Sequence, residues 1–510
     1  MNFFLIKYLS CNTFSLMISM TKKKKEAPIT GITVSKEDDF SGWYTELINK
    51  AELADIRYNI KGFVVYREWA TITIKKMYKK TEDLLEEKGH LPLTMPSLIP
   101  ESNFLLEAAH VKGFAPEVFW VTEAGSSGKL SERLALRPTS ETALYKMYSM
   151  WIRSYKDLPY KRYLSCQVWR YEGKMTRPFL RGREFHWIES HNVFATMEDA
   201  MEQVKEDMET TYQILQDECC IPLIFFQRPE WDKFAGAVHT YAADALMGSG
   251  KVLQLPSTHL LGQNFAKPFE VKFIDTDGKE KYGYQTCYGP AQSRNYGAMI
   301  AYLGDDKGLI LPFDLAPIQI IIVPIIFKGK ETVVLEKAEE ILSKLKENYI
   351  VKIDKSDDSV GNKFYFWELK GVPIRIEIGP KDIEKHQIVI VKRYNSQKII
   401  ISEDDLVSTV KEITQNYTRE LKENSLIDFE SQIELCYEKD AAVEAINQGK
   451  IVCCGFCSID MDAHRCAEIV EKEIGGEVRG KRIDEEKNEF ATCIICGKPA
   501  GCTVYIAKSY

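Results

Sequence analysis

The chain has 510 residues, of which 45% are apolar and 28% are charged, a composition typical of a globular protein with about two to four domains. Its formal net charge is −7, from 67 basic and 74 acidic side chains, which excludes a chain that holds nucleic acid through bulk positive charge. The longest apolar run near the start, residues 3–6, is too short for a membrane span and makes a poor signal peptide.

Residues 1–36 are expected to form a mobile tail that carries a basic run, Lys22–Lys25. A solvated terminus explains these lysines more simply than an RNA contact. The first twenty residues contain no arginine, which disfavours a mitochondrial presequence. A second start at Met20 would give a cytosolic N-terminus, and we expect a cytoplasmic protein.

Residues 62–100 predict a long amphipathic helix that ends near Gly89 and a short strand closed by Pro96. Downstream, the string LALRPTSETALY predicts a strand that gives way to a helix. Thr139 or Ser140 can cap that helix, which is the simple structural interpretation. A hydroxyl and a carboxylate at a pocket rim, Thr139 and Glu141, can also hold an ammonium group, because both offer acceptors for its N–H donors.

Two β-rich runs, 163–171 and 183–194, predict an antiparallel hairpin with a long loop that contains several cationic residues. Arg170 and Glu172 point to one face because the strand period is two, and Arg181 follows the loop. A guanidinium fork suits phosphate and stacks on a purine, and a carboxylate can accept from an adenine amino group. A salt-bridged surface hairpin is the alternative for an isolated R-x-E motif.

Residues 197–218 have a helical period and many acidic residues, and they predict a solvated helix. Residues 252–297 predict strands, a hairpin turn at Asp277-Gly278, and an apolar helix that begins near Arg294. Alone, His259 would more often be a structural histidine than a ligand contact.

A new pattern of buried strands and helices begins at Pro317 and predicts an α/β unit. Seven of the thirteen cysteines follow residue 450, which favours a metal site in a reducing compartment over disulfides. Cys493-x₂-Cys496 is a strong half of a tetrahedral zinc site. On the residues alone, the other half remains open between Cys457 with Cys466 and their neighbours Cys453, Cys454 and Cys502.

Read together, these motifs resemble class II aminoacyl-tRNA synthetases, and the strings RPFLRGREF, LRPTSET and LGQNFAKPFE resemble prolyl-tRNA synthetases of the archaeal and eukaryotic type. The resemblance extends from about Asp39 to the final IAKSY. The helix and strand of residues 62–100 resemble motif 1, the dimer-forming element, the hairpin resembles motif 2, and Arg294 matches the motif 3 arginine.

The resemblance implies roles for named residues. Thr139, Glu141, Arg170 and His259 would bind proline. ATP would contact Arg170, Glu172, Arg181, Gln254, Ser257, Gln292 and Arg294, with Mg²⁺ at Gln254. The string FCSIDMDAHRC selects Cys457 and Cys466 as the partners of Cys493 and Cys496 around a structural Zn²⁺. Tyr510 resembles a C-terminus that folds back towards the active site.

The chain departs from the family pattern at three places, namely Ser257-Thr258-His259, Ala291-Gln292-Ser293-Arg294 and Ser190-His191-Asn192. Hydroxyls are kept at 257 and 258, so the chemistry is expected to be intact. Only about 60 residues separate His191 from Gln254, where bacterial relatives carry a large editing domain, so no editing in cis is expected.

The expected fold is α/β (α+β), with an antiparallel-sheet catalytic domain (37–316), an α/β anticodon-binding domain (317–424) and a zinc-binding C-terminal domain (425–510). The expected function is ATP-dependent activation of L-proline and its transfer to tRNA(Pro) by a homodimer outside any membrane. A synthetase for threonine, glycine or histidine, and a non-catalytic paralogue, are the alternatives. Plausible anticodon contacts are Trp367, Arg375, Lys381, Lys392 and Arg393.

Overall fold

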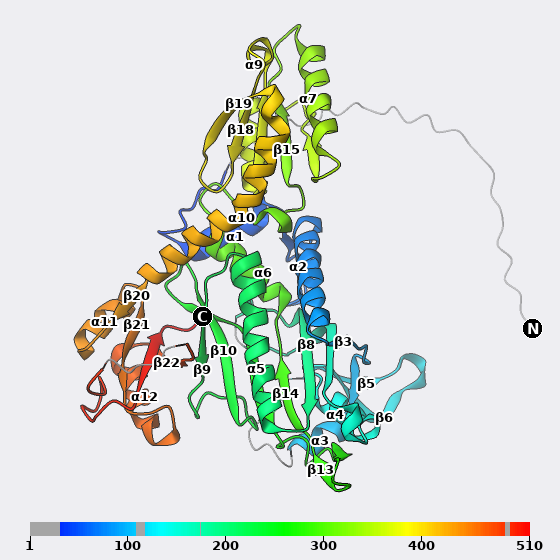
Figure 1. The fold of residues 1–510 in the computed structure, drawn as a ribbon, viewed down its shortest axis with the longest axis vertical. Coiled ribbons are helices and arrows are strands. Elements are labelled where there is room, and N and C mark those ends of the chain that lie inside the picture. The colour runs from blue at the N-terminus through cyan, green and yellow to red at the C-terminus, as the bar shows by residue number, and fades with distance from the viewer. Residues whose placement is uncertain (1–30, 109–117, 174, 485–489) are drawn as a thin grey trace, which may run out of the picture.

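The computed structural model describes residues 31–108, 118–173, 175–484 and 490–510. Figure 1 shows a large sheet with its helices in the centre, an α/β unit above it and a smaller C-terminal unit at its side. Helix α10 (Leu406–Ser431) runs from the upper unit to the C-terminal unit, so the expected boundary at 424/425 lies inside one continuous helix. No helix of the described residues is long and apolar enough to cross a membrane.

The central sheet has eleven strands and joins the middle of the chain to its C-terminal end. Its order is β20-β21-β23-β22-β9-β10-β11-β14-β8-β7-β3, and the strands from β22 to β7 pair antiparallel with their neighbours. In that order the strands are Ile433–Leu435, Ile451–Phe456, Cys502–Ala507, Glu477–Arg482, Ile224–Gln227, His239–Leu246, Val252–Gly262, Tyr284–Tyr288, Glu184–Phe194, Tyr160–Trp169 and Leu91–Pro92.

The predicted hairpin is confirmed as β7 and β8, which pair in register from Tyr160 opposite Val193 to Trp169 opposite Glu184. Because side chains alternate along a strand, every second residue of β8 faces the same side of the sheet. This alternation decides which β8 side chains reach the functional cavity described below.

Three helices cover one face of this sheet, namely α2 (Glu68–Glu87), α5 (Met197–Thr211) and α6 (Gln292–Leu303). The expected long helix is confirmed as α2, and Gly89 follows it with a φ of +85°. The expectation of a solvated helix over 197–218 is wrong for one face, since α5 packs on β11 and buries Val204, Asp207 and Met208. The chain continues from α5 as a π-helix, Tyr212–Glu218.

Smaller elements complete the central unit. They are α1 (Phe40–Lys50), β1 (Ala54–Asp55), β2 (Val65–Tyr66), β4 (Leu98–Pro100), α3 (Glu101–Ala108), β5 (Trp120–Glu123), β6 (Lys129–Leu136), α4 (Glu141–Trp151), β12 (Lys272–Ile274) and β13 (Glu280–Tyr282). The turn between β12 and β13 contains Gly278 with a φ of +74°, as the Asp-Gly pair predicts.

The upper unit is a five-stranded mixed sheet of order β16-β15-β17-β18-β19. Its elements are β15 (Ile320–Pro324), α7 (Glu331–Leu345), β16 (Val351–Ile353), α8 (Val360–Leu369), β17 (Ile374–Ile378), α9 (Pro380–Glu384), β18 (Gln387–Lys392) and β19 (Lys398–Ser402). Sequence analysis predicts an α/β unit here but misses α9 and β19, which have only five residues each. The C-terminal unit adds α11 (Lys439–Asn447), α12 (His464–Ile469) and a π-helix (Val470–Ile474) to its strands.

Candidate active site

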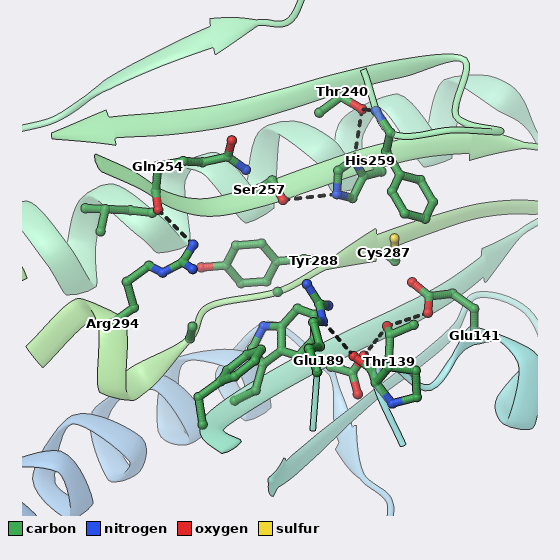
Figure 2. Close-up of a pocket in the computed structure, with 18 of the residues that line it drawn as sticks. Thr139, Glu141, Glu189, Thr240, Gln254, Ser257, His259, Cys287, Tyr288 and Arg294 are labelled. Carbon is green, nitrogen blue, oxygen red and sulfur yellow. Dashed lines mark hydrogen bonds between the residues drawn. The ribbon is translucent and has the colours of Figure 1, made fainter. Parts of the chain in front are cut away.

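A cavity of about 680 Å³ opens on one face of the central sheet, and strands β8, β10, β11 and β14 contribute to its walls. Nine of the ten predicted proline and ATP residues line it, namely Thr139, Glu141, Arg170, Glu172, Arg181, Gln254, Ser257, His259 and Arg294. Figure 2 shows Thr139, Glu141 and Glu189 at one side of the cavity and Gln254 and Arg294 at another. The sheet therefore gathers residues that are far apart in the sequence into one place.

Four arginines line the cavity. Arg228 is paired with the buried Asp244, and the other guanidinium groups form a group of three, Arg170, Arg181 and Arg294. Arg170 donates to Pro138 O over 3.0 Å, and Arg294 donates to Leu180 O over 3.1 Å. Burial lowers the pKa of Arg294 to about 10, and the charges of the other two arginines act in the same direction. Like charges held together at a partly buried wall favour a bound polyanion such as a triphosphate.

Arg170 is also held by aromatic rings of β8. Its guanidinium carbon lies 4.8 Å from the ring centroid of Trp187 and 5.5 Å from that of Phe185. Stacking on these rings and the bond to Pro138 fix the direction of the guanidinium fork, because a planar group against an aromatic face has little freedom to turn. The backbone of Glu172 is fixed in turn by Arg183, which donates to Glu172 O over 3.2 Å.

A network of hydroxyls and carboxylates lies across the cavity from Arg294. The Thr139 hydroxyl is within hydrogen-bond distance of two carboxylates, Glu141 and Glu189. Ser140 donates to Glu189 from its backbone N–H and from its hydroxyl. The expected helix cap is therefore absent at the start of α4: the Ser140 side chain makes no capping bond.

His191 and Tyr145 complete this network. His191 Nε2 lies 3.7 Å from Glu189 Oε1, and its Nδ1 lies 3.1 Å from the Tyr145 hydroxyl. Burial opposes the charged form of His191, but the carboxylates Glu189 and Glu141 raise its pKa. All of these side chains are buried, so the network can present oriented acceptors to a cation.

His259 forms part of an apolar wall with Phe234. The two ring centroids are 4.7 Å apart, and both imidazole nitrogens are hydrogen-bonded, Nδ1 with Thr240 over 2.9 Å and Nε2 with Ser257 over 3.0 Å. Burial lowers the pKa of His259 to about 3, and His191 acts in the same direction, so the ring is neutral. A flat neutral wall beside a cation-binding network suits a small apolar ring that carries an ammonium group.

Gln292 is the predicted site residue that does not line the cavity. Its side chain is fully buried, and Nε2 donates to Thr81 of α2 over 3.1 Å. It lies at the first residue of α6, two positions before Arg294, so its contact ties α6 to α2. Its predicted contact with ATP stays a prediction.

Sequence analysis missed several lining residues, among them Phe185, Trp187, Glu189 and His191. These four occupy alternate positions of β8, and the strand period would have found them once Arg170 had been placed on the same face. Other missed residues come from the loop and strand after β9, namely Arg228, Asp232, Lys233, Phe234 and Thr240. These residues belong to none of the sequence motifs described above.

Tyr510 folds back onto the hairpin loop and contacts Arg181, a residue that lines the cavity, as expected. Arg181 Nη2 donates to Tyr510 O over 3.3 Å, and Arg177 Nη1 donates to the Tyr510 hydroxyl over 2.8 Å. The backbone N–H of Tyr510 donates to Val252 O, at the start of β11. The last residue therefore bridges the hairpin loop and the strand that carries Gln254.

Cys457, Cys466, Cys493 and Cys496 form a separate cluster in the C-terminal unit. Their sulfur atoms all lie within 4.8 Å of one another, and the Sγ atoms of Cys457 and Cys466 are 3.7 Å apart. A tetrahedral zinc site with Zn–S bonds of about 2.3 Å has sulfur–sulfur edges of about 3.8 Å, so the four thiols fit zinc. The competing cysteines Cys453, Cys454 and Cys502 lie outside this cluster.

Four of the five plausible anticodon contacts have partners within the chain. Trp367 donates to Asp354 over 2.7 Å, Arg375 pairs with Glu368 at 2.8 Å, Lys392 pairs with Glu420 at 2.9 Å, and Arg393 pairs with Asp305. Lys381 is exposed. Their contact with RNA stays a prediction.

Comparison with family models divides the chain into three matched parts. The tRNA synthetase class II core domain (G, H, P, S and T) matches residues 119–302, the anticodon binding domain matches residues 319–413, and the prolyl-tRNA synthetase C-terminal domain matches residues 439–510. These ranges follow the central unit, the upper unit and the C-terminal unit of the fold.

Relatives and solved structures match over nearly the whole chain. Proline--tRNA ligase of Thermofilum pendens is 48% identical over 94% of this chain and 99% of its own, and that of Methanopyrus kandleri is 42% identical over 92% and 96%. The structure of Giardia lamblia prolyl-tRNA synthetase in complex with prolyl-adenylate matches with a TM-score of 0.91, at 35% identity over 94% of this chain and 100% of the other. That of the Cryptosporidium parvum enzyme complexed with halofuginone and AMPPNP matches with a TM-score of 0.88, at 32% identity over 94% and 99%.

Proposed function

The chain belongs to the prolyl-tRNA synthetase family, and from this premise we propose that it activates L-proline with ATP and transfers the prolyl group to the 3′ end of tRNA(Pro). The observation that carries the proposal is one cavity that brings Arg170, Arg181 and Arg294 together with the Thr139–Glu141 pair. Activation needs both, because a triphosphate and an amino acid must meet there.

In the proposed reaction, the carboxylate of proline attacks the α-phosphorus of ATP, prolyl-adenylate forms and pyrophosphate leaves. No side chain acts as a nucleophile. Arg170, held against Trp187, is placed to orient the proline carboxylate and the α-phosphate, and Arg181 and Arg294 to neutralise the leaving pyrophosphate. Alignment and charge stabilisation of this kind are sufficient for large rate accelerations.

We assign the two ends of proline to the two sides of the cavity. The ammonium group would bind Thr139 and Glu141, and the ring would pack against the neutral His259 and Phe234 wall. Glu172 would accept from the adenine amino group, and Gln254 and Ser257 would contact ATP. Magnesium, when bound, would offset phosphate charge, and the Gln254 side-chain oxygen at the cavity wall is a ligand of the hard type that it prefers.

A structural Zn²⁺ is proposed for the four-cysteine cluster, on the fit of its sulfur spacing. Thiolates would hold it, and the ion would fix the loop that precedes β23. None of the twelve cysteines of the described residues forms a disulfide, which supports a reducing compartment, and we propose the cytoplasm.

A homodimer is proposed through α2 and the adjoining edge of the sheet. Strand β3 is the last strand of the sheet on that side, and Ile72 of α2, Leu91 of β3 and Leu98 of β4 are 42%, 55% and 39% exposed. Large apolar side chains beside an open strand edge are costly in water, so a second copy is a suitable cover. The upper unit, 317–424, is proposed to bind the anticodon.

An isotope exchange assay between pyrophosphate and ATP, run with a panel of amino acids, tests the function. Proline should support exchange far better than threonine, glycine or histidine, and the charging of tRNA(Pro) should follow. Preference for one of the other three amino acids would assign a different class II synthetase. Exchange with none would favour a non-catalytic paralogue.

A further inference from the structure

The Thr139 hydroxyl lies between two buried carboxylates and has a single proton to give. Its oxygen lies 2.7 Å from Glu189 Oε1 and 2.5 Å from Glu141 Oε2. Both distances suit a short O–H···O⁻ bond, but one hydroxyl donates to one acceptor at a time. The position of this proton therefore decides which carboxylate Thr139 is bonded to, and whether its lone pairs remain available.

Of the two carboxylates, Glu189 is the better placed to accept the hydrogen bond from the Thr139 hydroxyl. Ser140 holds both of its oxygens, with the backbone N–H at 3.0 Å from Oε1 and the hydroxyl bonded to Oε2. His191 lies 3.7 Å from Oε1. Glu189 is 2% exposed, and although burial alone would raise its pKa, the bonds from His191, Ser140 and Thr139 lower it, so the group stays ionised and acts only as an acceptor.

We propose that Glu189 is a positioning residue: it accepts the hydrogen bond from the Thr139 hydroxyl and thereby leaves the lone pairs of Thr139 Oγ1 available to accept from the ammonium group of proline. The inference rests on the proposed function and deepens it. The secondary ammonium of proline has two N–H donors, and Glu141 and Thr139 supply the two acceptors only while the Thr139 proton points to Glu189. If that proton pointed to Glu141, it would compete with the substrate for the same carboxylate.

A rival explanation for the same residues is a cation site, since Glu141, Glu189 and His191 each offer a ligand atom within 4.8 Å of the others. The hydrogen bonds argue against it. Both oxygens of Glu189 already accept from Thr139 or Ser140, and Glu141 Oε2 lies 2.5 Å from the Thr139 hydroxyl oxygen. Metal ligands would have to give up these bonds, so the arrangement is that of a carboxylate that orders hydroxyl protons.

The test is a double-mutant cycle on the full chain, with Glu189→Gln, Thr139→Val and the pair together, read by proline-dependent pyrophosphate exchange. Glutamine keeps the size of Glu189, but its amide can donate to Thr139 and turn the hydroxyl towards Glu141. Glu189→Gln alone should raise the KM for proline roughly 10- to 100-fold, as for the loss of a hydrogen bond to a charged group, and leave the KM for ATP within about twofold.

In the Thr139→Val background, Glu189→Gln should change the KM for proline by less than about threefold, because no hydroxyl proton remains to be placed. In the Thr139→Ser background the full effect should return. Glu184→Gln, on the same strand but outside the cavity, is the matched control and should leave both KM values unchanged. If Glu189→Gln does not fold, Glu189→Asp keeps the charge, withdraws the acceptor, and should give the same pattern.

Additive effects of Glu189→Gln and Thr139→Val would overturn the proposal, as would an equal rise in the KM for ATP. A wild-type activity that depends on added Zn²⁺ or Co²⁺ and is lost in Glu189→Gln would replace it with the cation site. Absence of proline-dependent exchange in the wild type would refute the proposed function and this inference with it, whereas exchange with additive effects refutes only the role of Glu189.

Discussion

The buried charge cluster between the central sheet and the C-terminal unit gives the sharpest stability prediction. Asp244 of β10 accepts from two arginines: Arg228 at 2.6 and 3.1 Å, and Arg479 of β22 at 2.7 and 3.2 Å. The side chains of Arg228 and Asp244 are each 1% exposed and that of Arg479 is 6% exposed. Each arginine therefore makes a two-pronged, desolvated contact with one carboxylate.

The perturbation is Arg479→Met, which keeps the length of the side chain and removes its charge. Hydrogen bonds to charged groups contribute about 1.5–3 kcal/mol each, and breaking a buried pair costs about 3–5 kcal/mol. Because Arg228 still neutralises Asp244 in the variant, we expect the lower end, a loss of about 3 kcal/mol in the free energy of unfolding. Asp244→Asn should cost more, since it leaves two buried guanidinium groups without their carboxylate.

Urea denaturation followed by tryptophan fluorescence measures the loss as a fall in the midpoint with little change in slope. Lys439→Met is the matched control, because Lys439 pairs with Glu473 at the surface of the same unit, where both side chains are about half exposed. Its midpoint should stay at the wild-type value. Equal midpoints for Arg479→Met and Lys439→Met would refute the reasoning, since the buried cluster would then contribute no more than a surface pair.

Arg294→Ala should cost about 2–4 kcal/mol of transition-state stabilisation, measured as a fall in kcat/KM for pyrophosphate exchange. A kcat/KM within about threefold of wild type would show that Arg294 does not act on the phosphates of ATP. Zinc should co-purify at one ion per chain, and a chelator should unfold the C-terminal unit, which has its own core, before the central unit; a metal-free protein of unchanged stability would show four simple thiols. Burial, and to a lesser degree the charge of Glu206, raises the pKa of Asp207 from an ordinary value of 3.8 to about 7. Its contribution to stability is therefore present at low pH and is lost as pH rises from about 4 through 7. Asp207→Asn should flatten the dependence of the unfolding free energy on pH, measured by urea titrations, and an unchanged dependence would contradict this. Alanine should be activated slowly, because each methylene of a proline pocket is worth only about 1–3 kcal/mol. Its ester with tRNA(Pro) should be left intact, because no editing in cis is expected, and rapid deacylation by the purified chain would contradict this.

Local patterns predict the elements and most of the site, because their signals lie within a few residues. The β7–β8 hairpin follows from two branched and aromatic runs around a polar loop, and the end of α2 follows from Gly89. Nine predicted residues line one cavity because each lies in a motif whose order along the chain was recognised. Gln292 was placed by the same motif, but its side chain bonds to α2, a contact that spacing does not encode.

The parts that were missed depend on contacts between distant segments. The acidic period of residues 197–218 indicates solvent, yet Asp207 is buried because Thr258 of β11 donates to it over 2.7 Å, a bond that exists only after the sheet has formed. The hydroxyl of Ser140 suits a helix cap, yet it donates its hydrogen bond to Glu189, a residue of β8. A buried acceptor from another strand outcompetes the local backbone, because a buried carboxylate without donors costs more free energy than a neutral backbone N–H group without an acceptor.

The position of the C-terminal unit links the four-cysteine cluster, although it lies outside the cavity, to the candidate site. Strand β22 pairs with β9, so the central unit and the C-terminal unit share one sheet. Two members of the four-cysteine cluster, Cys493 and Cys496, lie in the loop that leads into β23. Residues 508–510 continue from β23 and pair with Val252, two positions before Gln254, while Tyr510 contacts Arg177 and Arg181. Strand β23 is hydrogen-bonded on both edges, to β21 and β22, and so joins the loop that carries Cys493 and Cys496 firmly to residues 508–510. Removal of a metal from the four-cysteine cluster should therefore weaken ATP binding, because Tyr510 contacts Arg181, one of the residues that line the cavity.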